Sequence, residues 1–234
     1  MTAPQENPSQ CSSLSTKAWR SESTRPRKLK PDTSNLPVVL TVGHSTRTLA
    51  EFVRLLRAHE VSRVVDVRTV PRSRHNPQFN KASLPRALKK AGLNYVHMPG
   101  LGGLRHAKRD SINMGWRNTS FRGFADYMQT PEFKLSLEEL IRLAKQERVA
   151  LMCAEAVPWR CHRSLIADAL LVRGIRTEDI MSPIRRNVHT LTPCAKVRGT
   201  TITYPAEVSP EKLKKSSSLR SAPHLLEHLI HTRT

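Results

Sequence analysis

Short apolar runs alternate with amphipathic segments along the middle of the chain. The β-branched run at 38–42 ends at Gly43, a pattern typical of a buried strand. Thr48 and Glu51 then have the spacing of a capping box, and an apolar helical face follows them. By the same criteria the sequence predicts further strands at 61–67, 94–98, 149–153 and 175–181, and an additional edge strand at 197–204. It predicts further helices at 81–91, 121–129, 131–147 and 161–173. Alternating strands and helices predict an α/β fold, with a mostly parallel sheet flanked by helices on both faces in a Rossmann-like or rhodanese-like three-layer arrangement.

The folded part of the chain is expected to be a single domain at 37–204. Residues 1–36 are polar, basic and rich in Pro, Ser and Thr, which predicts a disordered tail. Beyond 205 the chain is polar again, which predicts a flexible tail with one short helix at 223–231.

A cytoplasmic location, with no membrane partner, is expected from three features of the sequence. No apolar run approaches the roughly 20 residues of a membrane-spanning helix. The N-terminus lacks the apolar block of a secretory signal. The four cysteines show no regular framework, which suits a reducing compartment.

The net charge of +20 lies mainly in the expected domain. Residues 1–35 contribute +3 and residues 196–234 contribute +4, which leaves +13 for 36–195. The segment from Arg63 to Arg122 contains thirteen Lys and Arg residues but only two acidic residues, and most of the basic residues are Arg. Because the planar guanidinium suits bidentate contacts with phosphate and carboxylate, we expect an anionic or phosphate-bearing ligand, with nucleic acid among the options. A basic surface that serves only solubility is the alternative.

Polar residues follow the predicted strands, where a parallel sheet binds its ligands. Gly43 permits a tight turn ahead of a helix start, whose free N–H groups suit an anion. The loop at 69–80 is dense in Arg and amide side chains, and the long glycine-bearing loop at 99–120 has the length of a functional lid. The substrate-binding candidates from these loops are His44, Ser45, Arg68, Arg72, Arg74, Asn76, Gln78, Asn80 and Arg117. Asp66 either pairs with Arg68 or takes part in catalysis.

The segment after the fourth strand has the strongest chemical signal. Cys153 ends that strand, and Cys161, His162 and Arg163 stand where the next helix is expected to begin. A helix N-terminus, an Arg and a His favour a thiolate, which suits a nucleophilic or redox role, while Glu155 could act as acid or base. A disulfide between the two cysteines, metal ligation together with His162, and a buried cysteine without chemistry are the alternatives. The spacing matches no common zinc pattern, so no metal is assigned.

Four motifs occur in order along the chain: TVGHST at 41–46, VDVR at 65–68 with PRSR and NPQFN behind it, CAEAVPWRCHR at 153–163, and HTLTP at 189–193. Through them, residues 38–193 resemble the bacterial domain of unknown function family 488. The resemblance implies an α/β fold and a shared polar site without a defined reaction. The matching polar positions are His44, Asp66, Arg68, Glu155, Cys161, His162 and Arg163.

A more distant similarity links the chain to rhodanese-like domains. These also carry Asp-Val-Arg after one strand and a Cys after a later strand. The loop behind Cys153 contains Pro and Trp instead of the short glycine-bearing loop of those enzymes, so sulfur transfer and phosphatase activity are not carried over.

Three functions fit this pattern. The first is an enzyme acting on an anionic or nucleotide-like substrate, with proton transfer by Glu155 and His162 and a Cys nucleophile. The second is a nucleic-acid-binding or nucleic-acid-processing module, of a kind associated with DNA repair, in which Trp116 or Trp159 stacks on bases. The third is a binding protein without catalysis.

The grouping of Glu, Cys and His with Arg at the strand ends favours the enzyme. Its catalytic candidates are Glu155, His162, Cys161, Cys153 and Asp66, and Trp159, Arg160 and Arg163 join the substrate-binding candidates. The sequence indicates no particular cofactor and no oligomeric state.

Overall fold

A six-stranded sheet forms the centre of the computed structural model, which describes residues 37–206. The strands are β1 (Val38–Gly43), β2 (Arg63–Asp66), β3 (Asn94–His97), β4 (Val149–Cys153), β5 (Arg176–Ser182) and β6 (Arg185–Val188). They lie in the order β3-β2-β4-β1-β5-β6. The first five in the chain are parallel, and β6 runs antiparallel to β5. The predicted α/β fold with a mostly parallel sheet is confirmed.

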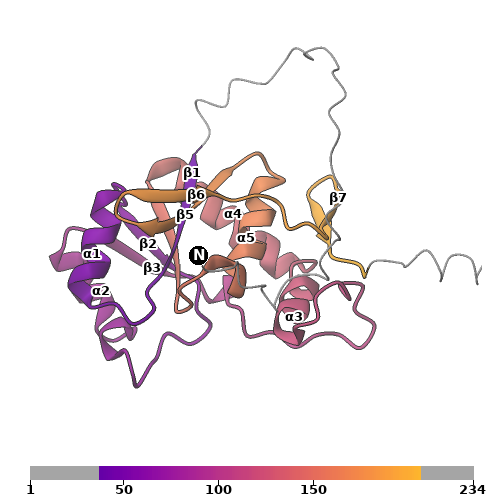
Figure 1. Ribbon diagram of the computed structural model, residues 1–234, viewed down its shortest axis with the longest axis horizontal. Coiled ribbons are helices and arrows are strands. Elements are labelled where there is room, and N and C mark those ends of the chain that lie inside the picture. The colour runs from indigo at the N-terminus through magenta and orange to yellow at the C-terminus, as the bar shows by residue number, and fades with distance from the viewer. Residues whose placement is uncertain (1–36, 207–234) are drawn as a thin grey trace, which may run out of the picture.

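Helices cover both faces of this sheet (Figure 1). On one face lie α1 (Leu49–Ala58) and α2 (Leu84–Lys90), and on the other lie α3 (Thr119–Tyr127), α4 (Pro131–Gln146) and α5 (Arg163–Leu171). Neighbouring strand residues point to opposite faces, so Leu40 packs in the core with α1 and α2 while Val39 packs in the core with α3, α4 and α5. Both faces being buried explains why β1 and β4 read as continuous apolar runs.

The C-terminal strands differ from the sequence prediction. Residues 197–204 do not add an edge to the main sheet, because β7 (Lys196–Arg198) and β8 (Thr201–Thr203) pair with each other as a separate hairpin. The edge is β6 instead, whose polar sequence RRNV carries no apolar pattern. Its pairing is supported by Arg186, which forms an ion pair with Glu178 on β5.

Three short helices, η2 (Pro77–Phe79), η3 (Pro99–Leu101) and η4 (Pro158–Arg160), lie in the loops that follow β2, β3 and β4. In the part of the chain that the structure describes, no helix combines the length and apolar character needed to cross a membrane. The predicted tail at 1–36 lies outside the described residues, as does the predicted tail at 205–234 from residue 207 onward, with its short helix at 223–231.

A fully buried carboxylate ties the C-terminal segment to α5. Asp168 accepts hydrogen bonds from His189 Nε2 at 2.8 Å, the Thr192 backbone N–H at 3.1 Å and the Tyr204 hydroxyl at 2.8 Å. Burial and the neighbouring Asp168 raise the pKa of Tyr204, so its hydroxyl keeps the proton that it donates. One side chain therefore holds three points of the chain that follows β6.

We expect Asp168→Ala to lower the free energy of unfolding by about 3–5 kcal/mol, since three buried donors lose their acceptor. Urea denaturation monitored by circular dichroism measures this loss. The control is Glu139→Ala, which removes an exposed acid from α4 and should change stability by less than about 0.5 kcal/mol. Similar losses in the two variants would contradict the assignment.

Candidate functional site

A cavity of about 630 Å³ opens at the carboxyl ends of β1, β2 and β4. Residues from four parts of the chain line it: 44–46, six of the residues between 68 and 76, 103–104 with 120–121, and 153–156 with 160–162. Ten of the candidate residues lie in its wall: His44, Ser45, Arg68, Arg72, Asn76, Cys153, Glu155, Arg160, Cys161 and His162. The structure thus brings together polar side chains that are more than 100 positions apart in the sequence.

The seam between β1 and β4 positions the loop that carries the cysteines. Gly43 lies beside Cys153 in the sheet register, and a Cβ atom on Gly43 would stand 1.9 Å from the carbonyl oxygen of Glu155. The next two residues, His44 and Ser45, donate their backbone N–H groups to the carbonyls of Cys153 and Ala154, at 2.9 and 3.0 Å. A side chain at 43 would push this loop away, so the glycine serves the approach of protein backbone and not that of a ligand.

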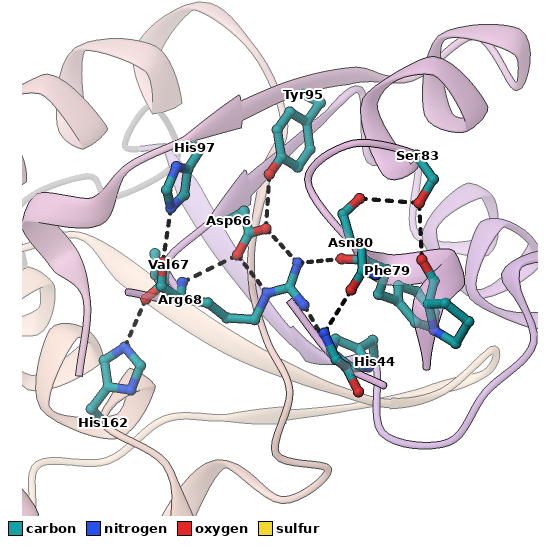
Figure 2. A network of polar contacts seen from close by, with 12 residues as sticks. His44, Asp66, Val67, Arg68, Phe79, Asn80, Ser83, Tyr95, His97 and His162 are labelled. Atoms are coloured by element: carbon teal, nitrogen blue, oxygen red, sulfur yellow. Dashed lines mark hydrogen bonds and ion pairs between the residues drawn. The ribbon is translucent and has the colours of Figure 1, made fainter. Parts of the chain in front are cut away.

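A buried ion pair forms the floor on the β2 side (Figure 2). Arg68 donates from Nε to Asp66 Oδ1 at 2.9 Å and from Nη2 to Asp66 Oδ2 at 2.6 Å. Its Nη2 also donates to the Phe79 carbonyl at 2.7 Å, and the Tyr95 hydroxyl donates to Asp66 Oδ2 at 2.8 Å. Asp66 is fully buried and its charge is matched by Arg68, so we interpret it as a positioning residue.

The imidazole of His44 is held neutral between this pair and the cavity. Its ring stacks on Phe79 with centroids 4.2 Å apart, and its Nδ1 lies 2.8 Å from the Ser45 carbonyl. Burial lowers the pKa of His44 to about 4, and the charge of Arg68 adds to this against the opposing hydrogen bond to Ser45. With the hydrogen on Nδ1, Nε2 accepts from Arg68 Nη1 at 3.2 Å.

The sulfur of Cys161 lies in the cavity wall, next to a buried guanidinium and an imidazole. Arg163 Nε donates to it at 3.4 Å, and His162 Nδ1 lies 3.7 Å from it. Burial alone would raise the pKa of Cys161, but a hydrogen bond from Cys153 and the charges of Arg163 and His162 lower it well below the usual value. The pKa of Cys153 is raised by its hydrogen bond to Cys161 and by burial. Within the pair, the lower pKa therefore belongs to Cys161 and the higher pKa to Cys153.

His162 joins the loop after β4 to the end of β2. Its Nε2 donates to the Val67 carbonyl at 3.1 Å (Figure 2). This contact leaves Nδ1 to face Cys161, at 3.7 Å. Gly103 covers the ring so closely that a Cβ atom there would lie 2.4 Å from Nδ1. An imidazolium in this place donates to the thiolate, and a neutral ring presents a lone pair to it.

Two arginines at the cavity have no protein partner. Arg72 and Arg160 are exposed, and within residues 37–206 neither guanidinium makes a hydrogen bond or ion pair. The acidic member of the wall is Glu155, whose Oε1 accepts the N–H of Ala156 at 3.0 Å. The wall is therefore net positive, with exposed positive charges at 72 and 160.

Seven candidate residues do not line the cavity: Asp66, Arg74, Gln78, Asn80, Arg117, Trp159 and Arg163. The side-chain amide of Gln78 donates to the Arg47 carbonyl, and Asn80 Oδ1 accepts from the Ser73 N–H. Both contacts shape the loop. Arg74 and Arg117 are exposed elsewhere, and Trp159 lines a separate hollow of about 300 Å³.

Trp116 is buried against Phe121 and Tyr204, so the expected base stacking by Trp116 is wrong. An aromatic residue in a basic loop gives no sequence signal that separates stacking on a ligand from anchoring in a core. The sequence also did not single out the apolar part of the wall, Val70, Leu104 and Phe121, or the support of Asp66 by Tyr95.

The depressed pKa of His44 predicts a loss of stability in acid. The unfolded chain takes up a proton near pH 6.5 that the folded protein accepts only near pH 4. The neutral, buried His44 ring therefore contributes to the free energy of unfolding above pH 6.5. This contribution is lost as the pH falls towards 4. Between pH 7 and 4.5 the wild type should lose about 2 kcal/mol more unfolding free energy than His44→Gln. Denaturant titrations at both pH values measure the difference. His75→Gln, which removes an exposed histidine, should behave as wild type.

Comparison with known proteins gives a family without an assigned reaction. The family model described as "Domain of unknown function DUF488" matches residues 48–170. The match runs from the first turn of α1 into the last turn of α5, so it contains both cavity cysteines and the Asp66–Arg68 pair. Neither the curated proteins nor the solved structures yield a match. Because the model covers more than half of the chain, the protein belongs to the DUF488 family.

Proposed function

We propose that this protein is an enzyme in which the Cys161 thiolate is the nucleophile towards a small anionic substrate bound in the cavity. The observation that carries the proposal is the position of the Cys161 sulfur, in the cavity wall and 3.4 Å from the buried guanidinium of Arg163. A thiolate is intrinsically a strong nucleophile, and a cavity wall gives a substrate access to it.

The charge of the wall supports an anionic substrate. Arg72 and Arg160 are free to bind it, whereas Arg68 and Arg163 already have partners inside the protein. Two guanidinium groups suit a phosphate or carboxylate that replaces their water. A nucleotide-like substrate is compatible with the apolar stretches at Val70 and Leu104.

The reaction that follows is covalent catalysis. Cys161 Sγ forms a bond to an electrophilic centre of the substrate, and the leaving group departs with its bonding electron pair. His162, as imidazolium, or Glu155, when protonated, supplies the proton that the leaving group needs. Water then displaces the sulfur, with the same group now acting as base, and the thiolate is restored.

The depth of the sulfur argues for a small substrate over an intact duplex. Cys161 is 4% exposed, so only a small molecule or an extended group can reach it. Burial of Trp116 also removes one of the two aromatic side chains that a base-stacking surface would use. Salt-dependent binding of DNA or RNA that is unaffected by Cys161→Ser would favour the binding module.

We expect Cys161 to react rapidly with iodoacetamide at neutral pH, with a rate whose midpoint lies well below the usual titration range of a thiol. Peptide mass spectrometry of the full chain at a series of pH values measures the rate. Cys153→Ala removes the donor thiol and should raise the midpoint. Cys153→Ser, which keeps a hydroxyl donor, is the matched control and should raise it less. A midpoint equal to that of free cysteine would contradict the assignment of Cys161 as the nucleophile.

The arginines should make the site select for negative charge. Iodoacetate and iodoacetamide share a leaving group and differ by one charge. The rate with iodoacetate divided by the rate with iodoacetamide at Cys161 therefore reports the local potential. We expect Arg72→Ala and Arg160→Ala each to lower this ratio several-fold at low salt, and added salt to do the same in the wild type. Arg74→Ala removes an exposed arginine of the same loop that does not line the cavity, and should leave the ratio near the wild-type value. Equal ratios in all four proteins would argue against an anion site.

A further inference from the structure

We propose that Cys153, Cys161 and His162 form a three-ligand site for a Zn²⁺-class cation, whose fourth position opens into the cavity. The two sulfurs and one ring nitrogen all lie within 4.8 Å of one another, and all three residues line the cavity. The inference goes beyond the proposed function because it concerns binding of a metal and does not require the covalent reaction.

The spacing of the donor atoms fits a tetrahedral ion. Zinc bond lengths of about 2.3 Å to sulfur and 2.0–2.1 Å to nitrogen imply a sulfur–nitrogen separation of about 3.6 Å across the ion. Cys161 Sγ and His162 Nδ1 are 3.7 Å apart. The same arithmetic places the two sulfurs about 3.8 Å apart, within the limit set by the cluster. A cation can therefore enter with small side-chain rotations and no change of fold.

The surroundings already orient the donor atoms. His162 donates its Nε2 hydrogen to the Val67 carbonyl at 3.1 Å, and this is the outer contact that ligating histidines usually make. It fixes the ring so that Nδ1 offers a lone pair towards the sulfurs. Arg163 Nε donates to Cys161 at 3.4 Å, which leaves other lone pairs of that sulfur for the ion. Arg163 also holds the loop through the Glu155 carbonyl, at 2.7 Å.

The chemistry of the donors selects a borderline or soft cation. Two thiolates and an imidazole suit zinc over magnesium or calcium, which prefer oxygen. Binding displaces the proton of Cys153 to solvent, and two thiolates neutralise the charge of the ion. Three protein ligands with one open position are the pattern of catalytic zinc sites, whereas structural sites use four.

Adjacent ligands at 161 and 162 do not resemble a zinc motif in the sequence, because their meeting with Cys153 depends on the fold. Cys153 ends β4, and the chain returns through η4 to Cys161, eight residues later and two residues before α5 begins. Gly43 and Gly103 allow this return, since a Cβ at either position would collide with Glu155 or with the His162 ring.

A cation bound at this site would lower the nucleophilicity of the Cys161 sulfur. A metal-bound sulfur is a weaker nucleophile than a free thiolate, so bound zinc should slow the alkylation of Cys161 and a chelator should restore it. This consequence depends on the proposed function, whereas the metal binding itself does not.

The test is a Co²⁺ titration of the full-length, metal-free protein in a non-thiol reductant. We expect one Co²⁺ per chain, with thiolate-to-metal charge-transfer absorption in the near ultraviolet and the visible bands of a tetrahedral ion, and stoichiometric displacement by Zn²⁺. Cys153→Ser, Cys161→Ser and His162→Gln should each weaken binding by about tenfold or more. His75→Gln, which removes an exposed histidine outside the cavity, is the matched control and should bind as wild type.

Wild-type protein alone decides the proposal if a ligand variant fails to fold. Absence of the charge-transfer band at a stoichiometric Co²⁺ concentration would overturn the site, as would a band that the folded ligand variants retain. Peptide mapping of alkylated wild type should show Zn²⁺ protecting Cys153 and Cys161 together. Fast alkylation of Cys161 without metal binding would overturn the metal site and support the nucleophile. Metal binding by a protein whose Cys161 has an ordinary alkylation rate would support the metal site and overturn the nucleophile.

Discussion

The buried guanidinium of Arg163 is the constraint on which the proposed chemistry of this cavity depends. Arg163 is 1% exposed, and an arginine side chain stays charged in any protein environment. Burying a cation costs several kcal/mol unless acceptors surround it. The partners that Arg163 contacts are the Glu155 carbonyl and the Cys161 sulfur, and of these only the sulfur can carry a full charge. The guanidinium therefore favours the thiolate form of Cys161, and the hydrogen bond from Cys153 lowers the pKa of Cys161 further.

The second buried guanidinium has the opposite role. Arg68 is paired bidentately with Asp66, and this pair also takes a hydrogen bond from Tyr95. Its charge is used within the protein, which leaves neutral His44 to face the cavity. Two arginines that look alike in the sequence thus have different partners, because one faces a carboxylate and the other the sulfur of Cys161. The proposed positive charge for a ligand comes from the exposed Arg72 and Arg160 instead.

The fold and the meeting of the loops could be predicted because both follow from backbone rules. Apolar runs marked β1 and β4, and parallel strands carry their following loops to one edge, which placed His44 near Cys161. The roles inside the cavity could not be predicted in the same way. Gln78 and Asn80 looked like ligand-binding amides, and their use in shaping the loop depends on distances that spacing does not encode. The edge strand β6 was missed because its polar residues pair through backbone and through Arg186, without apolar periodicity.

The motif after β2 supports the cysteine site largely through its main chain. The Val67 carbonyl orients His162, the Arg68 carbonyl accepts from His97 at 2.8 Å, and Asp66 holds the Arg68 side chain in place. A displacement of this segment would turn His162 away from Cys161 without touching either residue. The three residues at 66–68 and the segment at 161–163 are therefore structurally coupled across the ends of β2 and β4. Under the two proposals, the orientation of the His162 ring governs whether Cys161 meets an imidazolium, which would stabilise the nucleophile, or a lone pair, which would complete the metal site.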